Sequence, residues 1–174
     1  ATRRGHRDKV DVLAVSPTDG TIFSGSYDGD IRVWDGSTGR YLRTIGNTNS
    51  WVGGLAPTPD GKKLVSTCIG GPPCASEPQI VWDIAGGRRL QQPRHHDNIV
   101  IATATSPDGR LVVTGGGGNH VVHVWDINTG DTRKVLAGTG APRWATGFSA
   151  DGQNIGWGNT WRSGRIRHAS EASS

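Results

Sequence analysis

The chain has 174 residues, 33% of them hydrophobic and 27 of them glycine, with a formal net charge of +4. This composition favours a turn-rich β protein over long helices, and no apolar run approaches the roughly 18 residues of a membrane span. The first ten residues lack the apolar core of a signal peptide, so we expect a cytoplasmic protein without a membrane partner. Because the chain contains no methionine, we also expect it to be a piece excised from something longer.

The first part of the chain predicts four short strands. The stretch VDVLAV at 10–15 precedes the turn SPTDG, and TIFSGS at 21–26, DIRVWD at 30–35 and YLRTI at 41–45 follow it. Apolar stretches of five or six residues bounded by Asp-Gly or Thr-Gly are typical of antiparallel hairpins. This segment is therefore predicted to be a four-stranded antiparallel unit.

The same order of elements returns further along the chain. Related turns, SPTDG, TPDG, SPDG and SADG, recur at intervals of 42, 48 and 43 residues. Similar third stretches, IRVWD, QIVWD and VHVWD, end in a Trp-Asp pair in the first three units, whereas the fourth unit ends in IRHAS without a further stretch. Self-similarity at this period indicates a repeat architecture.

With these motifs and the Gly-His dipeptide at Gly5 and His6, the chain resembles WD-repeat β-propeller proteins, and among them bacterial-type members. The resemblance implies an all-β propeller built of four-stranded antiparallel blades, with three complete blades and a partial fourth. The propeller segment is expected to span 1–168, with a disordered tail at 169–174. The expected blades are about 5–46, 47–92, 93–137 and 138–168.

The resemblance also implies a hydrogen-bonded set that ties each blade together: the Gly-His histidine, a Ser or Thr of the second strand, the Asp of the following turn and the Trp of the third strand. Ser24 and Ser26 are both candidates for the serine of the first unit, and His95 and His96 for the histidine of the third. A buried indole and a buried imidazole each need a partner, so we interpret this set as structural and not as a catalytic triad. The residues assigned to it are His6, Ser24, Asp28, Trp34, Trp82, His95 and Trp125.

The second unit departs most from the pattern. It reads GNTNSW where Gly-His is expected, and the loop between its second and third strands is the longer GGPPCASEPQ. Cys68 and Cys74 lie six residues apart without a matching His or Cys cluster, so we expect free thiols and neither a zinc site nor a disulfide framework. No other pattern indicates a catalytic residue, a metal ligand or a cofactor, and we predict that the chain is not an enzyme.

Three blades and three further strands fall short of the seven-bladed ring that WD-repeat proteins most often resemble. An open stack leaves unpaired strand edges and an exposed apolar face. We therefore expect self-assembly, or missing blades that complete the ring. A segment of a larger ring, half of a two-chain ring and a four-bladed ring lacking one strand are all open alternatives.

One face of the predicted propeller gathers the loops that enter each first strand and the loops between second and third strands. The resemblance implies that this face captures proteins or peptides, and Trp and Arg are enriched at such interfaces. For Trp51 and Trp144, packing between blades is an equally open interpretation. The candidate partner-binding residues are Arg7, Lys9, Tyr27, Trp51, Pro73, Cys74, His96, His120, Arg143 and Trp144.

These observations favour a non-enzymatic protein–protein interaction scaffold. The alternative is a sensor or regulatory segment of a larger bacterial enzyme, because IGWGNTW resembles the last units of bacterial WD-repeat proteins that carry a caspase-like peptidase domain. Nucleic-acid binding ranks last, because it rests on the positive charge alone.

Overall fold

The computed structural model describes residues 5–71, 74, 76–116, 121–136 and 145–158, and the backbone of 167–170. Its regular elements are all β-strands, and no helix in the described residues has the length and apolar character that a membrane span requires. The strands are β1 Val10–Val15, β2 Ile22–Ser26, β3 Asp30–Trp34, β4 Tyr41–Asn47, β5 Trp51–Pro57, β6 Lys63–Gly70, β7 Gln79–Asp83, β8 Arg89–Gln91, β9 Val100–Thr105, β10 Leu111–Gly116, β11 Val121–Asp126, β12 Thr132–Leu136, β13 Ala145–Phe148, β14 Asn154–Gly158 and β15 Arg167–Ser170.

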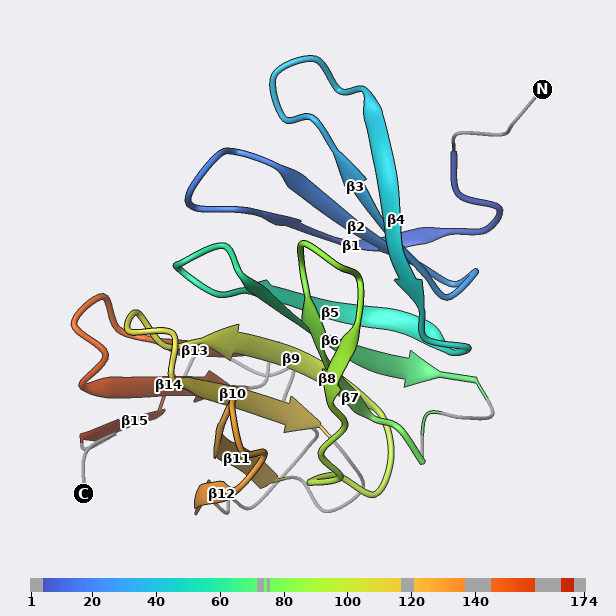
Figure 1. Cartoon of the computed structure of the whole chain (residues 1–174). Helices are drawn as coiled ribbons and strands as arrows, with labels where there is room; N and C mark the ends of the chain where they lie inside the picture. Colours follow the sequence, from blue (N-terminus) through green and yellow to red (C-terminus); the bar gives the residue numbers. More distant parts are fainter. Residues whose placement is uncertain are drawn as a thin grey trace.

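These strands form three four-stranded sheets and one three-stranded sheet, each a simple antiparallel meander in chain order. The sheets follow one another from β1–β4 to β13–β15, and they do not close into a ring (Figure 1). The predicted fold, propeller blades with a partial fourth, is confirmed. The last strand, β15, includes Ala169 and Ser170, which the sequence had assigned to a disordered tail, because both residues pair with β14.

Successive sheets pack face to face through three apolar clusters. The clusters are built from β-branched and aromatic side chains on alternate positions of the strands, as expected for sheets buried on both sides. The first junction contains Phe23, Ile31, Val33, Val52, Leu64 and Trp82. The second contains Ala56, Val65, Val81, Val112 and Trp125. The third contains Val113, Val122, Val124, Ile155 and Trp157.

The first strands of neighbouring sheets, β1, β5, β9 and β13, contact one another and form the inner line of the stack. In the first three sheets the pairing of this strand with the second strand shifts at the same place. The shifts lie between Val10 and Val12, between Val52 and Gly54, and opposite the Gly115–Gly116 step of β10. A bulge at a fixed position bends the strand and sets the direction of the loop that enters it.

Candidate interaction face

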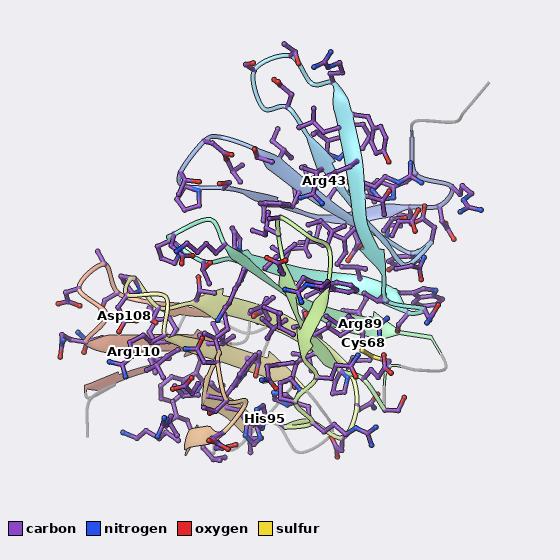
Figure 2. All side chains as sticks on the ribbon, in the orientation of Figure 1. Arg43, Cys68, Arg89, His95, Asp108 and Arg110 are labelled. Atoms are coloured by element: carbon purple, nitrogen blue, oxygen red, sulfur yellow. A yellow bond between two sulfur atoms is a disulfide. The ribbon has the colours of Figure 1, made fainter. Side chains whose placement is uncertain are left out.

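The strand order places two sets of loops at opposite ends of the sheets. Figure 2 shows Asp108 and Arg110, in the turn between β9 and β10, at the far end of the strands from Cys68, where β6 leads into β7. We call the end that carries Cys68 the loop face. In the described residues it consists of 5–9, 27–29, 48–50, 71, 74, 76–78 and 92–99, together with Trp51 at the start of β5.

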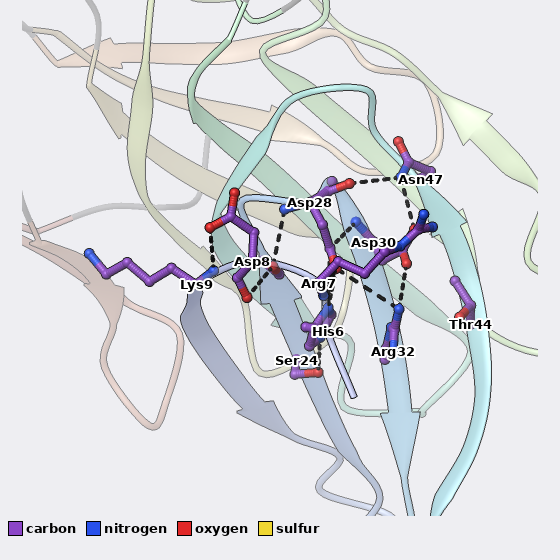
Figure 3. A network of polar contacts seen from close by, with 12 residues as sticks. His6, Arg7, Asp8, Lys9, Ser24, Asp28, Asp30, Arg32, Thr44 and Asn47 are labelled. Atoms are coloured by element: carbon purple, nitrogen blue, oxygen red, sulfur yellow. Dashed lines mark hydrogen bonds and ion pairs between the residues drawn. The ribbon is translucent and has the colours of Figure 1, made fainter. Parts of the chain in front are cut away.

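The first sheet carries a complete hydrogen-bonded set near this face, and three of its members, His6, Ser24 and Asp28, are labelled in Figure 3. The indole Nε1 of Trp34 donates to Ser24 Oγ at 2.7 Å, and Ser24 Oγ lies 2.7 Å from His6 Nε2. The other ring nitrogen of His6 lies 3.1 Å from the carboxylate of Asp28. The structure thus brings together the four residues assigned to the set in the first unit, with Ser24 and not Ser26 in the serine position.

The carboxylate of Asp28 orders the entry of the chain into the first sheet. It accepts the backbone N–H of Arg7 at 2.7 Å and that of Asp30 at 2.9 Å. Burial on its own raises the pKa of Asp28, but the two backbone N–H groups and His6 outweigh it and hold this pKa below its ordinary value. The loop face is therefore held rigidly at its first corner.

The side chains of His6, Asp28 and Asp30 place a possible metal-ligand atom each within 4.8 Å of one another. These atoms already hold protein partners: Arg32 Nη2 lies 2.8 Å from the Asp30 carboxylate, and Asn47 donates to the same group at 2.8 Å. A guanidinium inside the cluster supplies the positive charge that a cation would bring. We interpret the cluster as a structural network.

The second sheet lacks a histidine and uses other groups. Trp82 Nε1 donates to Ser66 Oγ at 2.8 Å, as in the first sheet. The guanidinium of Arg89 lies 5.2 Å from the centre of the Trp82 ring, donates to Glu77 at 2.9 Å and donates to the backbone oxygen of Asn47 at 2.8 Å. Arg89 and Glu77 are not predictable from the repeat, because they lie outside the motif that identifies the other members.

In the third sheet the histidine of the set is His96, and the assignment to His95 was wrong. His96 is buried, with Nε2 3.1 Å from Thr114 Oγ1, and Trp125 Nε1 donates to the same oxygen at 3.2 Å. His95 instead lies beside Thr132, its Nδ1 3.1 Å from the hydroxyl. Adjacent residues point their side chains in different directions, so the choice between His95 and His96 depends on the path of the loop that carries them. Its burial also removes His96 from the surface on which it was predicted to bind a partner.

The most exposed aromatic feature of the loop face is a stack of Tyr27 and Trp51. Their ring centres are 4.7 Å apart and the planes are within 3° of parallel. Lys9 Nζ lies 5.0 Å from the Tyr27 ring, on a side chain that is itself mostly exposed, and Gly70 lies against the Trp51 ring. Trp51 belongs to the second sheet and stacks on Tyr27 of the first, so it contacts the neighbouring blade as the alternative supposed, but at 43% exposed it is not buried between the blades.

The two cysteines form a disulfide, and the expectation of free thiols was wrong. The inserted loop folds back on itself: the backbone N–H of Cys74 donates to Gly71, and that of Cys68 donates to Pro78. These bonds bring the two Cα atoms to 5.6 Å, a separation that a disulfide spans. Both cysteines are buried, so Cys74 offers a partner no surface.

The structure places Arg7 and Lys9 at the exposed edge of the loop face. Four other predicted partner-binding residues lie outside the described residues. They are Pro73, His120, Arg143 and Trp144.

Residues 1–35 and 87–126 match the family described as WD domain, G-beta repeat. The chain is similar to the nuclear distribution protein nudF of Aspergillus niger, with 32% identity over 61% of this chain and 23% of that protein. It is also similar to the WD repeat domain-containing protein 83 homolog of Dictyostelium discoideum, with 26% identity over 71% of this chain and 36% of that protein. A third relative is the ribosome biogenesis protein WDR12 homolog of Chlamydomonas reinhardtii, with 30% identity over 81% of this chain and 27% of that protein. The chain thus spans about a quarter to a third of the length of these relatives.

Proposed function

We propose that the chain is a non-enzymatic scaffold that binds a protein or peptide through its loop face. The observation that carries this proposal is the ridge of Lys9, Tyr27 and Trp51, in which two stacked rings remain partly exposed on a rigid support. Large aromatic side chains with a neighbouring cation supply contact area at low entropic cost, and loops on rigid scaffolds commonly carry recognition. The similarity to WD-repeat proteins is consistent with this role.

The proposal is tested by cross-linking partners to the purified chain and identifying them by mass spectrometry. A Trp51→Ala variant should lose at least tenfold of the specific capture while keeping its unfolding midpoint, because Trp51 packs on Tyr27 and Gly70 and not in the core. Lys62→Ala, an exposed change in the turn after β5 at the opposite end of the sheets, is the matched control and should leave capture unchanged. Equal capture by both variants would refute binding at the loop face.

A second component of the proposal concerns the outer face of β1–β4. This face is the counterpart of the faces of β5–β8 and β9–β12 that are covered by the preceding sheet, and Val10, Leu13 and Val15 are exposed on it. We propose that a further four-stranded unit covers it, from a second chain or from another part of a longer one. Such a unit would present β-branched side chains like those of Val65 and Val81.

The alternative, a regulatory segment of a bacterial caspase-like enzyme, gains no support from the relatives named above, which come from eukaryotes. Nucleic-acid binding still rests on the net charge of +4 alone. The cytoplasmic location stays a prediction, and the disulfide removes the free-thiol argument that supported it.

A further inference from the structure

The hydroxyl of Thr114 joins two sheets and three side chains. It lies 3.2 Å from Trp125 Nε1 and 3.1 Å from His96 Nε2, both in its own sheet. It also lies 3.3 Å from Nε2 of Gln79, which is fully buried on β7 of the preceding sheet. The amide oxygen of Gln79 faces the backbone N–H of His95 at 3.4 Å, so its NH₂ group is the end that points at Thr114.

Counting hydrogens fixes the protonation state of this network. A hydroxyl has one hydrogen and two lone pairs, and the N–H groups of Trp125 and Gln79 can only donate. They occupy both lone pairs of Thr114, so its hydrogen must go to His96 Nε2. His96 is therefore neutral, with its own hydrogen on Nδ1, and that buried nitrogen has no hydrogen-bond partner among the described residues.

A proton added to His96 has no place in this arrangement. It would put an N–H on Nε2, aimed at a hydroxyl whose lone pairs are both taken, and one existing donor would have to leave. The Trp125 indole is fixed by burial in the apolar cluster between β5–β8 and β9–β12, whereas Gln79 reaches Thr114 on a flexible side chain from the neighbouring sheet. The bond that is lost is therefore the one between the two sheets.

The first sheet solves the same problem differently. There Asp28 lies beside His6, and Ser24 accepts one N–H, from Trp34, so its second lone pair is open to a ring N–H of His6. Among the described residues, His96 Nε2 bonds to Thr114 and Nδ1 has no hydrogen-bond partner, so no carboxylate is bonded to this ring as Asp28 is to His6. The titratable groups that act on His96 are His95 and Asp97 from its own loop and His123 from β11, while β5–β8 contributes the neutral amide of Gln79, which bonds to Thr114.

We propose that Gln79, Thr114 and His96 form an acid-sensitive latch between β5–β8 and β9–β12, which opens when His96 takes up a proton. This inference deepens the proposed function and rests on it in one respect: opening the latch loosens the loop face at 92–99 and so weakens partner binding there. Burial, together with His123 and His95, lowers the pKa of His96 to about 4, although Asp97 and the backbone of Thr114 oppose the shift. The latch therefore holds fully above the ordinary pKa of about 6.5 and is lost as the pH falls toward about 4.

The test uses the intact chain without a partner. Nitrogen-15 NMR at neutral pH should find His96 as the Nδ1–H tautomer, and titration should find its pKa well below 6. Hydrogen exchange, corrected for intrinsic rates, should show protection in β7 and β9 falling at a higher pH than protection in β1–β4. An Nε2–H tautomer, a pKa near the ordinary value, or simultaneous loss of protection in all sheets would each overturn the proposal.

A pair of glutamine variants isolates the latch. Gln79→Leu frees a lone pair on Thr114, so the proton affinity of His96 should rise roughly tenfold, a pKa change of about one. Gln91→Leu is the matched control, because Gln91 also crosses between these sheets, donating to the backbone of Asn128 at 2.8 Å, but touches no histidine. The same His96 pKa in the two variants contradicts the latch. If Gln79→Leu fails to fold, the tautomer of His96 in the wild-type chain still tests the proposal. A partner that fails to bind at any pH would sink the proposed function and leave the latch intact.

Discussion

At the scale of single residues, one pairing recurs in all three complete sheets: the indole N–H of a third-strand Trp donates to a hydroxyl of the second strand. The pairs are Trp34 with Ser24, Trp82 with Ser66, and Trp125 with Thr114. The groups that accompany this pair differ: a His and an Asp in the first sheet, an Arg that lies against the indole ring and pairs with a Glu in the second, and a His and a Gln in the third. The hydroxyl is the constant part, because an indole without an acceptor would lose its hydrogen bond on burial.

We predict that Ser24→Ala lowers the free energy of unfolding by about 2 kcal/mol, because it leaves both Trp34 Nε1 and His6 Nε2 without a partner. Ser37→Ala is the control, since Ser37 is exposed in a turn and water replaces its bond to Asp35. Urea unfolding of the two variants measures the difference. A loss at Ser24 no larger than that at Ser37 would show that the set contributes nothing to stability.

The first unit was predictable residue by residue because all four members of its set stand in the motif. The third was not, because His95 and His96 are adjacent in sequence and only the path of the loop separates them. Gln79 could not have been found at all from the repeat. Its role depends on the neighbouring sheet, and a pattern within one unit carries no information about the next.

At the scale of elements, the turns between first and second strands repeat a local device. The first residue, a Ser or Thr, donates its hydroxyl to the Asp two positions later, at 2.6 Å in the second sheet and 2.5 Å in the third and fourth. The bond from the hydroxyl lowers the pKa of each of these Asp residues. The SPDG-type motifs in the sequence predicted only the shape of the turn. A glycine with positive φ completes each turn, at Gly61, Gly109 and Gly152.

Glycines inside strands mark the places where sheets approach most closely. We predict that Gly25→Ala lowers the free energy of unfolding by about 1–3 kcal/mol, because its new methyl group would overlap Val52 of the next sheet and Val12 of the neighbouring strand. Gly147→Ala in β13 is the matched control: nothing lies near its added methyl, and we expect a change within about 1 kcal/mol. Thermal unfolding of both variants tests the pair, and equal effects would argue against close sheet packing at Gly25.

The strands themselves were predictable from turn signals and alternating apolar residues, and the repeat gave their order. The loop between β6 and β7 was not, because an insertion breaks the repeat and its disulfide depends on backbone bonds made inside that loop. The bulges in β1, β5 and β9 were equally hidden. A one-residue shift changes which strand positions face one another and leaves no mark in composition.

At the scale of the whole molecule, equivalent positions in successive sheets differ because one of them lacks a neighbour. Val10 pairs with the end of β2 as Val52 pairs with the end of β6, yet Val10 is 46% exposed and Val52 is fully buried. Leu13 and Leu55 are likewise equivalent, at 66% and 8% exposed. An open apolar face of this kind favours association.

We predict that the 174-residue chain associates reversibly through this face, and that a Leu13→Thr/Val15→Thr double variant shifts the solution mass to the monomer. Threonine keeps the β-branched shape that strands favour, so the unfolding midpoint of the double variant should not fall. Leu55→Thr makes the same chemical change where the preceding sheet covers the side chain, and it should cost about 2–4 kcal/mol.

Light scattering over a dilution series separates the outcomes. A wild-type mass that falls with dilution, together with a double variant that stays monomeric throughout, places the contact on the outer face of β1–β4. A wild-type chain that is monomeric at every concentration would contradict the prediction, and association unchanged in the double variant would move the contact elsewhere. Because hydrophobic contacts persist in salt while contacts between exposed charges weaken, the mass should also hold when the ionic strength is raised.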